Sequence, residues 1–206
     1  MQILTLNAER LKEGVAFLAG VDADLAKIWG DLGIPPLWER EPGFSTLIFI
    51  ILEQQVSMAS AKAAYDRLLT VVSPLTPQSF LRLGDEELKK IGFSRQKAAY
   101  GRILAQAILD NELDLEELTA MPDEEVSACL TAIKGIGRWT ADNYLLLALL
   151  RQDVFPATDL ALQIAVQRVK NLPARPTTQE MENIAQAWRP WRSVATRLLW
   201  HHYLSK

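Results

Sequence analysis

LTAIKGIGRWTA (Leu130–Ala141) is the stretch that decides the fold, and PATDLALQ (Pro156–Gln163) follows it after a short linker. Gly135-Ile136-Gly137 lies between two helical patterns and leaves room only for a tight turn, which glycine permits because it adopts φ > 0 at no steric cost. The helix that follows presents unpaired N–H groups and the positive end of its macrodipole to this turn. Such a turn can bind a phosphate without a charged side chain. We therefore predict a hairpin of helices over 127–150 whose turn binds a nucleic-acid backbone.

Helical periodicity runs through most of the remaining chain, and there is neither a period-2 strand pattern of useful length nor an internal repeat. This pattern predicts an all-α fold. The expected helices are 8–18, 22–29, 44–52, 57–71, 76–83, 85–91, 95–110, 115–120, 122–132, 138–150, 160–170, 178–188 and 191–204.

Composition limits the class of protein. A chain of 206 residues can bury a sizeable core, as one large domain or two small intertwined ones. No apolar run reaches membrane-spanning length, and Met1–Leu11 has no basic segment ahead of an apolar one, so no secretory signal is expected. The single cysteine, Cys129, excludes an internal disulfide and a four-cysteine cluster. The default expectation is a cytoplasmic, nucleoid-associated protein.

The net charge of −3 argues mildly against a nucleic-acid partner, because affinity for DNA depends largely on neutralised phosphates. A local basic face could override that average. Basic residues do gather between Arg82 and Arg102, and Lys134 and Arg138 flank the glycine turn. From charge alone, the simpler interpretation of these clusters is a solvated helix face.

Three separated motifs carry a resemblance to a known family. KGIGRWTAD followed by PATDLALQ resembles the helix-hairpin-helix-Gly/Pro-Asp superfamily of DNA glycosylases, and within it the alkylpurine branch, 3-methyladenine DNA glycosylase II. FIILEQQVS (Phe49–Ser57) resembles the wedge segment of that branch, and WRPWRSVA (Trp188–Ala195) resembles its C-terminal signature. The resemblance covers most of the chain from Pro42 onward, without the extra N-terminal domain of the bacterial type member.

The resemblance implies one glycosylase domain, 1–206, built as two helical lobes with a DNA-binding cleft between them. Lobe A is expected to comprise 1–42 plus 152–206, and lobe B 43–151. It also implies a monomer that acts on double-stranded DNA containing damaged bases in base excision repair, without a membrane partner and without a cofactor. His201 and His202 are adjacent, with no further cysteine or histidine nearby, so no metal site is expected.

Asp159 is the candidate catalytic residue. Breaking the bond between a base and C1′ passes through a sugar with oxocarbenium-like charge, which a nearby carboxylate stabilises while it aligns or deprotonates a water. The alternative is that Thr158 or Asp159 only caps the helix that starts at Leu160. The two roles are compatible, and the spacing of the family motif favours catalysis.

Trp139 and other aromatic residues are the candidates for the base pocket. Relatives that also cleave the DNA backbone have a lysine at the position of Trp139, and an indole has no nucleophilic amine, so the resemblance implies a monofunctional enzyme. Alkylated purines such as 3-methyladenine and 7-methylguanine are cationic, and aromatic faces attract cations. Core packing is an equally good interpretation for most of these side chains. The pocket candidates are Trp139, Trp200, Trp38 and Tyr144, with Phe44 as a further one.

Two departures from the bacterial type member, Asn143 and Leu160 in place of tyrosines, put the substrate range in doubt. Gln55 is the candidate wedge that fills the gap left by an extruded base, with Met58 as a possible aid; an exposed polar turn is the alternative. The other expected DNA contacts are Gly135, Ile136, Gly137, Arg138, Lys134, Thr140, Gln54, Ser57, Arg95 and Lys97. Two other functions remain open: a non-catalytic helix-hairpin-helix DNA-binding protein, and a glycosylase for a different damaged base.

Overall fold

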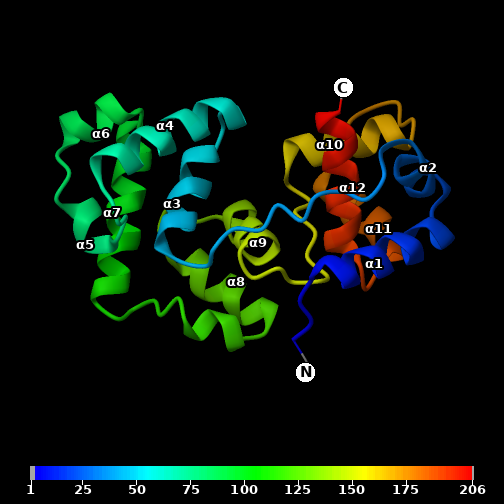
Figure 1. Ribbon diagram of the computed structural model, residues 1–206, viewed down its shortest axis with the longest axis horizontal. Helices are drawn as coiled ribbons and strands as arrows, with labels where there is room; N and C mark the ends of the chain where they lie inside the picture. The colour runs from blue at the N-terminus through cyan, green and yellow to red at the C-terminus, as the bar shows by residue number, and fades with distance from the viewer. Residues whose placement is uncertain (1–2, 206) are drawn as a thin grey trace. The chain divides into compact units, whose positions relative to one another are not determined.

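The computed structural model describes residues 3–205, and it is built from α-helices (Figure 1). Within these residues the only β-type pairing is an isolated antiparallel bridge between Thr5 and Arg151. The all-α prediction is confirmed. In the same part of the chain, no helix combines the length and the apolar character needed to cross a lipid bilayer.

The chain divides into two compact units, and the first combines both ends of the sequence, 1–39 with 145–206. In Figure 1 the blue N-terminal helices and the orange and red C-terminal helices belong to it. Helices α1 and α2 both pack against α12, and α10 also packs against α12. Trp188, Leu18, Leu25 and Leu198 are fully buried in its core. Its helices are α1 (Ala8–Val21), α2 (Ala23–Leu32), α10 (Leu160–Val169), α11 (Thr178–Ala185), the 3₁₀ helix η2 (Gln186–Trp188) and α12 (Arg192–Leu204).

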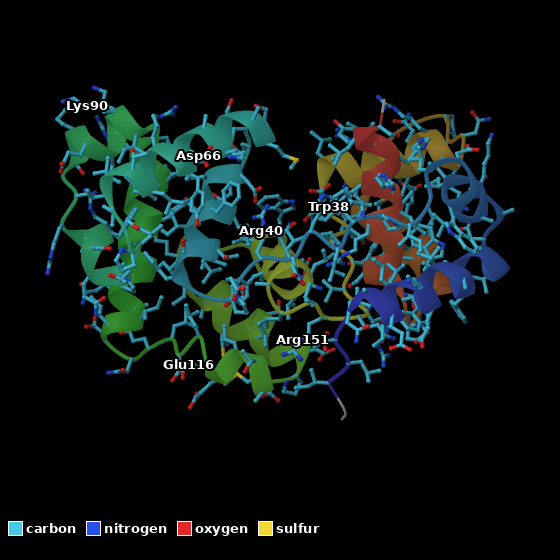
Figure 2. All side chains as sticks on the ribbon, viewed as in Figure 1. Trp38, Arg40, Asp66, Lys90, Glu116 and Arg151 are labelled. Carbon is cyan, nitrogen blue, oxygen red and sulfur yellow. The ribbon has the colours of Figure 1, made fainter. Side chains whose placement is uncertain are left out.

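The second unit is the continuous segment 40–144. Its apolar helix α3 packs against α4 and α7, and its core includes an edge-to-face pair of Phe44 and Phe80. The Arg40 guanidinium (labelled in Figure 2) lies over the ring of Phe49. Its helices are α3 (Phe44–Glu53), α4 (Met58–Val71), α5 (Pro77–Leu81), α6 (Asp85–Ile91), α7 (Arg95–Leu109), the 3₁₀ helix η1 (Glu117–Ala120), α8 (Asp123–Ala132) and α9 (Arg138–Leu147). The boundary between the units falls within α9, after Tyr144.

Several of the expected helices differ from the structure: α1 and α2 run on to Val21 and Leu32, beyond the predicted ends at Leu18 and Trp29, and α5 ends at Leu81, before the predicted Leu83. Three further helices differ as well. The segment expected over 115–120 is the 3₁₀ helix η1, because Asp114 Oδ1 accepts hydrogen bonds from the amides of Glu116 and Glu117 and tightens the turn. The second hairpin helix ends at Leu147 rather than at Leu150, whose φ of +52° is left-handed. The helix expected over 178–188 is α-helical only to Ala185 and then continues as η2.

Asp22 organises the first unit at the junction of α1 and α2. Its carboxylate caps α2 by accepting from the amides of Asp24 and Leu25. The same carboxylate accepts from Lys170 Nζ at 2.7 Å and from the Trp188 indole N–H at 2.7 Å. Burial by itself raises the pKa of Asp22, but the hydrogen bonds from Lys170 and Trp188 outweigh it, so that the pKa lies below its ordinary value.

We predict that Asp22→Asn lowers the free energy of unfolding by roughly 1–2 kcal/mol at pH 7, because the amide keeps the cap and loses the charge that faces Lys170. A carboxyl whose pKa is depressed by folding contributes stability above its ordinary pKa and loses it as the pH falls through the folded value. The difference from wild type should therefore shrink below about pH 4. Urea denaturation at pH 7 and at pH 3 measures it, with the exposed Asp31→Asn as the control. A difference that stays constant over this range would contradict the role of the charge.

Candidate functional site

Asp159 begins α10 and is 8% exposed. Its Oδ1 accepts a hydrogen bond from the Leu162 amide at 2.7 Å, so the predicted helix cap is present. The same oxygen accepts from the Trp200 indole N–H at 3.2 Å. The carboxylate is thus held by a donor from its own helix and by a donor from α12, and it lies at the N-terminal end of α10.

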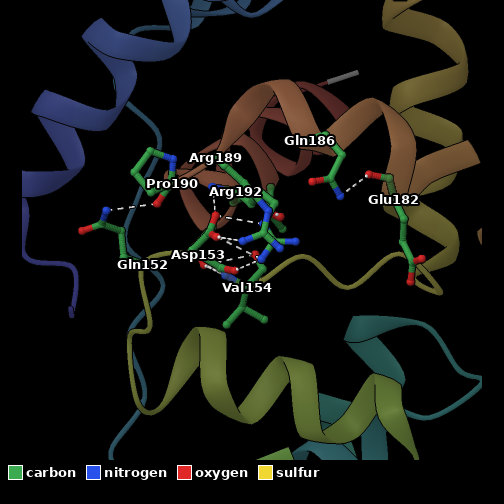
Figure 3. A network of polar contacts seen from close by, with 10 residues as sticks. Gln152, Asp153, Val154, Glu182, Gln186, Arg189, Pro190 and Arg192 are labelled. Carbon is green, nitrogen blue, oxygen red and sulfur yellow. Dashed lines mark hydrogen bonds and ion pairs between the residues drawn. The ribbon is translucent and has the colours of Figure 1, made fainter. Parts of the chain in front are cut away.

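The segment that leads to Asp159 is held by the start of α12 and the loop before it (Figure 3). Asp153 accepts from the guanidinium groups of Arg189 and Arg192, and the Arg192 side chain also donates to the Asp153 carbonyl. The Ser193 hydroxyl accepts from the Val154 amide and donates to the Val154 carbonyl. The WRPWRSVA motif therefore fixes the backbone from which the chain proceeds to Asp159.

Two further rings lie beside the Trp200 indole. Trp38 (Figure 2) meets Trp200 edge-on at a centroid distance of 6.3 Å, and it meets His201 edge-on at 6.4 Å. Trp38 has a φ of +49°, a left-handed conformation that costs a non-glycine residue on the order of 1–3 kcal/mol. Strain of this kind persists only where the surroundings impose it, so Trp38 is held in place.

Arg197 provides that restraint, and the sequence analysis missed it. Its side chain is fully buried and donates hydrogen bonds to three backbone carbonyls, of Leu37 at 2.9 Å, Leu146 at 2.8 Å and Ser193 at 3.1 Å. The Leu37 carbonyl directly precedes Trp38. Burial lowers the pKa of Arg197 well below its ordinary value. The only sequence signal is an arginine inside the apolar run that ends at Trp200, one helical turn before it.

The predicted hairpin turn joins α8 to α9 in the second unit. Gly135 has a φ of +99°, and a Cβ atom there would lie 2.2 Å from the ring of Tyr100 on α7, so only glycine fits. The Ile136 side chain is buried, whereas Lys134, Gly137 and Arg138 are exposed. The exposed members leave both basic side chains and backbone of the turn accessible to a ligand.

Trp139 is half-buried on the first turn of α9, and its carbonyl accepts from the Asn143 side-chain amide at 2.8 Å. Arg138 pairs with Asp142 one turn further along the same helix. Tyr144 is fully buried, and its hydroxyl accepts from the Gly43 amide at 3.0 Å. Burial raises the pKa of Tyr144. This contact gives Tyr144 the core role that the sequence left open.

The predicted wedge lies in the turn between α3 and α4. Gln55 is exposed, with a left-handed φ of +57°, and Met58 is 61% exposed. Ser57 caps α4 by accepting from the Ser60 amide. Gln54 lies beside Gln55 but its side-chain amide donates to the hairpin turn.

The two basic candidates at the start of α7 differ in their surroundings. Arg95 is exposed. The Lys97 ammonium is half-buried and donates to the Leu52 carbonyl at 2.7 Å, and burial lowers its pKa. Thr140 is buried and accepts a hydrogen bond from Gln54. Among residues 3–205 no three histidine, cysteine, aspartate or glutamate side chains gather as metal ligands would.

The structure thus brings the sequence-predicted residues together in two groups. In the first unit Asp159, Trp200 and Trp38 form a connected set, to which His201 and Arg197 belong although neither was a candidate. In the second unit the turn between α3 and α4 (the wedge turn) is in direct contact with the turn between α8 and α9 (the hairpin turn) and with the start of α9, through the side chain of Gln54.

Comparison with known proteins gives relatives over nearly the full chain. The alkylbase DNA glycosidase-like protein mag2 of Schizosaccharomyces pombe is 29% identical over 92% of this chain and 92% of its own length. DNA-3-methyladenine glycosylase 1 of the same yeast is 28% identical over 96% of this chain and 92% of its own. A solved structure of Schizosaccharomyces pombe 3-methyladenine DNA glycosylase in complex with abasic DNA superposes with a TM-score of 0.86 at 28% identity. The superposition covers 91% of this chain and 95% of the yeast glycosylase chain.

A family model matches residues 48–190, more than half of the chain, and these residues contain the wedge segment, the glycine turn and Asp159. The matched range therefore includes the wedge turn and the hairpin turn of the second unit and Asp159 of the first. The chain belongs to the HhH-GPD superfamily of base excision DNA repair proteins.

Proposed function

We propose that this chain is a monofunctional DNA N-glycosylase that flips alkylated purines, of the 3-methyladenine and 7-methylguanine type, out of double-stranded DNA and hydrolyses their N-glycosidic bond. The observation that carries the proposal is the Asp159 carboxylate, held by the α10 amide of Leu162 and by the Trp200 indole at the end of the superfamily motif. The names of the relatives, which include a DNA-3-methyladenine glycosylase, support the substrate class.

In the proposed mechanism the bond between C1′ and the purine nitrogen breaks, and its electron pair leaves with the base. Because an alkylated purine starts as a cation, it departs as a neutral molecule. The Asp159 carboxylate stabilises the positive charge that develops on the sugar. A water then adds its oxygen to C1′, and the carboxylate aligns that water or accepts its proton. The product is an abasic site with an intact backbone.

The aromatic residues supply the affinity for a cationic base. Each tryptophan face attracts a ring cation by about 0.5–2 kcal/mol, depending on how far the contact is desolvated. Trp200 and Trp38 meet edge-on beside Asp159 and form the proposed pocket wall. Trp139 stays a candidate for contact with the base from its place in the motif alone. The other two candidates, Tyr144 and Phe44, are assigned to the core.

DNA binding is assigned to the two turns of the second unit. The exposed backbone and side chains of the hairpin turn, Lys134, Gly137 and Arg138, would contact phosphates. Arg95 adds positive charge, and Gln55 would fill the gap left by the extruded base. The partner is double-stranded DNA, and we propose a monomer that acts at the nucleoid.

We predict that Asp159→Asn lowers the excision rate by at least about 100-fold, because the amide keeps the helix cap and removes the charge that stabilises the sugar cation. The measurement is release of free purines from methylated duplex DNA, resolved by chromatography. Affinity for the same duplex, measured by gel shift, should change by less than about threefold, since the hairpin turn is untouched.

Retained turnover in Asp159→Asn would rule out this mechanism. A wild-type protein that shifts methylated DNA without releasing any base would favour the non-catalytic DNA-binding alternative. Release of another damaged base, but of no methylated purine, would place the chain among glycosylases for a different lesion.

Trp200→Phe tests how Asp159 is oriented. Phenylalanine keeps an aromatic ring and removes the N–H that donates to Asp159 at 3.2 Å. A hydrogen bond to a charged group is worth about 1.5–3 kcal/mol, so we predict that single-turnover excision falls roughly tenfold or more. Trp29→Phe, at a partly exposed tryptophan of α2, is the matched control and should excise at the wild-type rate. Equal rates for the two variants would contradict the orienting role of Trp200.

A further prediction concerns strand cleavage. Because Trp139 has no amine, no Schiff base should form at C1′, and borohydride should trap no protein–DNA adduct. Product strands should break only after alkali treatment. Trp139→Lys should not produce an efficient lyase, because the inserted amine lacks a site that positions it for attack. An adduct trapped with the wild-type protein would contradict the monofunctional mechanism.

A further inference from the structure

Gln54 connects the wedge turn to the hairpin turn. Its side-chain Nε2 donates to the Gly135 carbonyl at 3.0 Å and to the Thr140 hydroxyl oxygen at 3.1 Å. An amide NH₂ group has two hydrogens, so these two acceptors use its full donor capacity. One acceptor lies in the glycine turn and the other in the first turn of α9. One side chain from α3 thus holds the hairpin at two points.

The same two turns are also held by helix α7. Lys97 donates to the Leu52 carbonyl at the C-terminal end of α3, where a cation is favoured by the helix macrodipole. One turn later, the Tyr100 ring occupies the space into which a Cβ at Gly135 would project. The relative position of the two turns is therefore determined by contacts from α3 and from α7.

Gln54 and Gln55 are neighbours in the wedge turn, but their side chains differ in exposure. Gln54 leaves α3 with extended ψ and its side chain is half-buried against the hairpin. Gln55 adopts the left-handed φ of +57° and is exposed, as are Val56 and Met58. The left-handed residue reverses the chain directly after the anchored one. Anchoring of Gln54 therefore specifies where Gln55 is presented.

We propose that Gln54 is a positioning residue that couples backbone binding by the hairpin turn to base extrusion by Gln55. The inference rests on the proposed function, because it takes the roles of the hairpin and of Gln55 from it. A phosphate bound at the hairpin holds the Gly135 turn, and the Gln54 amide transmits that position to the wedge. Gln54 thereby acts on the base through Gln55, although its own side chain is directed at the protein.

Two substitutions at Gln54 separate this role from a direct DNA contact. Gln54→Met has similar length and no donor, and Gln54→Glu keeps the shape but places acceptors against the Gly135 carbonyl. Thr140→Val removes one of the two acceptors at nearly constant volume. Gln55→Ala removes the proposed wedge itself. Gln179→Met, at an exposed glutamine of α11, is the matched control.

Four quantities are measured for each variant. The affinity for undamaged duplex DNA reports on binding by the hairpin turn. The fluorescence of a 2-aminopurine placed beside a methylated purine reports on extrusion, and single-turnover base release reports on excision. Amide hydrogen exchange over 52–58 and 133–140 in the free protein reports on the coupling of the two turns without any DNA.

For Gln54→Met we expect affinity for undamaged duplex within about twofold of wild type, and extrusion and excision reduced roughly tenfold, since two ordinary hydrogen bonds are lost. Gln54→Glu should lose at least as much. Exchange in both turns should rise in these variants and stay unchanged in Gln179→Met. The losses of Gln54→Met and Thr140→Val should be less than additive in the double variant, because they remove a shared contact.

Equal losses of affinity and of excision in Gln54→Met would overturn the proposal in favour of a direct DNA contact. Wild-type extrusion in that variant, or unchanged exchange, would overturn it outright. Additive losses in the double variant would do the same. If the wild-type protein releases no base from any methylated DNA, the proposed function fails, whereas the exchange measurement still decides whether Gln54 joins the two turns.

Discussion

The first unit depends on the buried guanidinium of Arg197, whose three hydrogen bonds end on backbone carbonyls. Burying a guanidinium is costly unless its donors are satisfied, so the segment before Trp38 and the end of α9 must both lie where their carbonyls can meet it. That requirement places the Trp38 ring, in a strained backbone conformation, beside Trp200. Trp200 in turn donates to Asp159. The proposed catalytic carboxylate is thus linked to the buried arginine through two aromatic rings.

Asp159 illustrates how a structural and a chemical role can share one residue. As a cap it satisfies an amide at the start of α10, and its carboxylate is the group that the proposed reaction needs beside the sugar. Asparagine would serve the first role and fail in the second. The cap therefore stabilises the helix and also fixes the orientation of the group that would stabilise the sugar cation.

In the second unit, side-chain contacts hold the wedge turn and the hairpin turn in place. In the proposed function the glycine turn stays open to a phosphate and the wedge turn stays exposed, so burial of apolar side chains, such as Ile136, can stabilise these turns only in part. The contacts of Gln54, Lys97 and Tyr100 supply further rigidity. Binding sites need such support, because a loosely held contact loses much of its effect.

The sequence by itself determined the all-α class, most helix boundaries, the cap at Asp159 and the glycine turn, because periodicity, caps and turn conformations depend on neighbouring residues. Tertiary structure alone decided the burial of Arg197, the core role of Tyr144 and the different directions of Gln54 and Gln55. These depend on partners far along the chain: Arg197 and Leu37 are 160 residues apart, and Gln54 and Gly135 are 81 apart. A local pattern states that a side chain is polar or aromatic, but only the packed chain brings to it the distant group that it contacts.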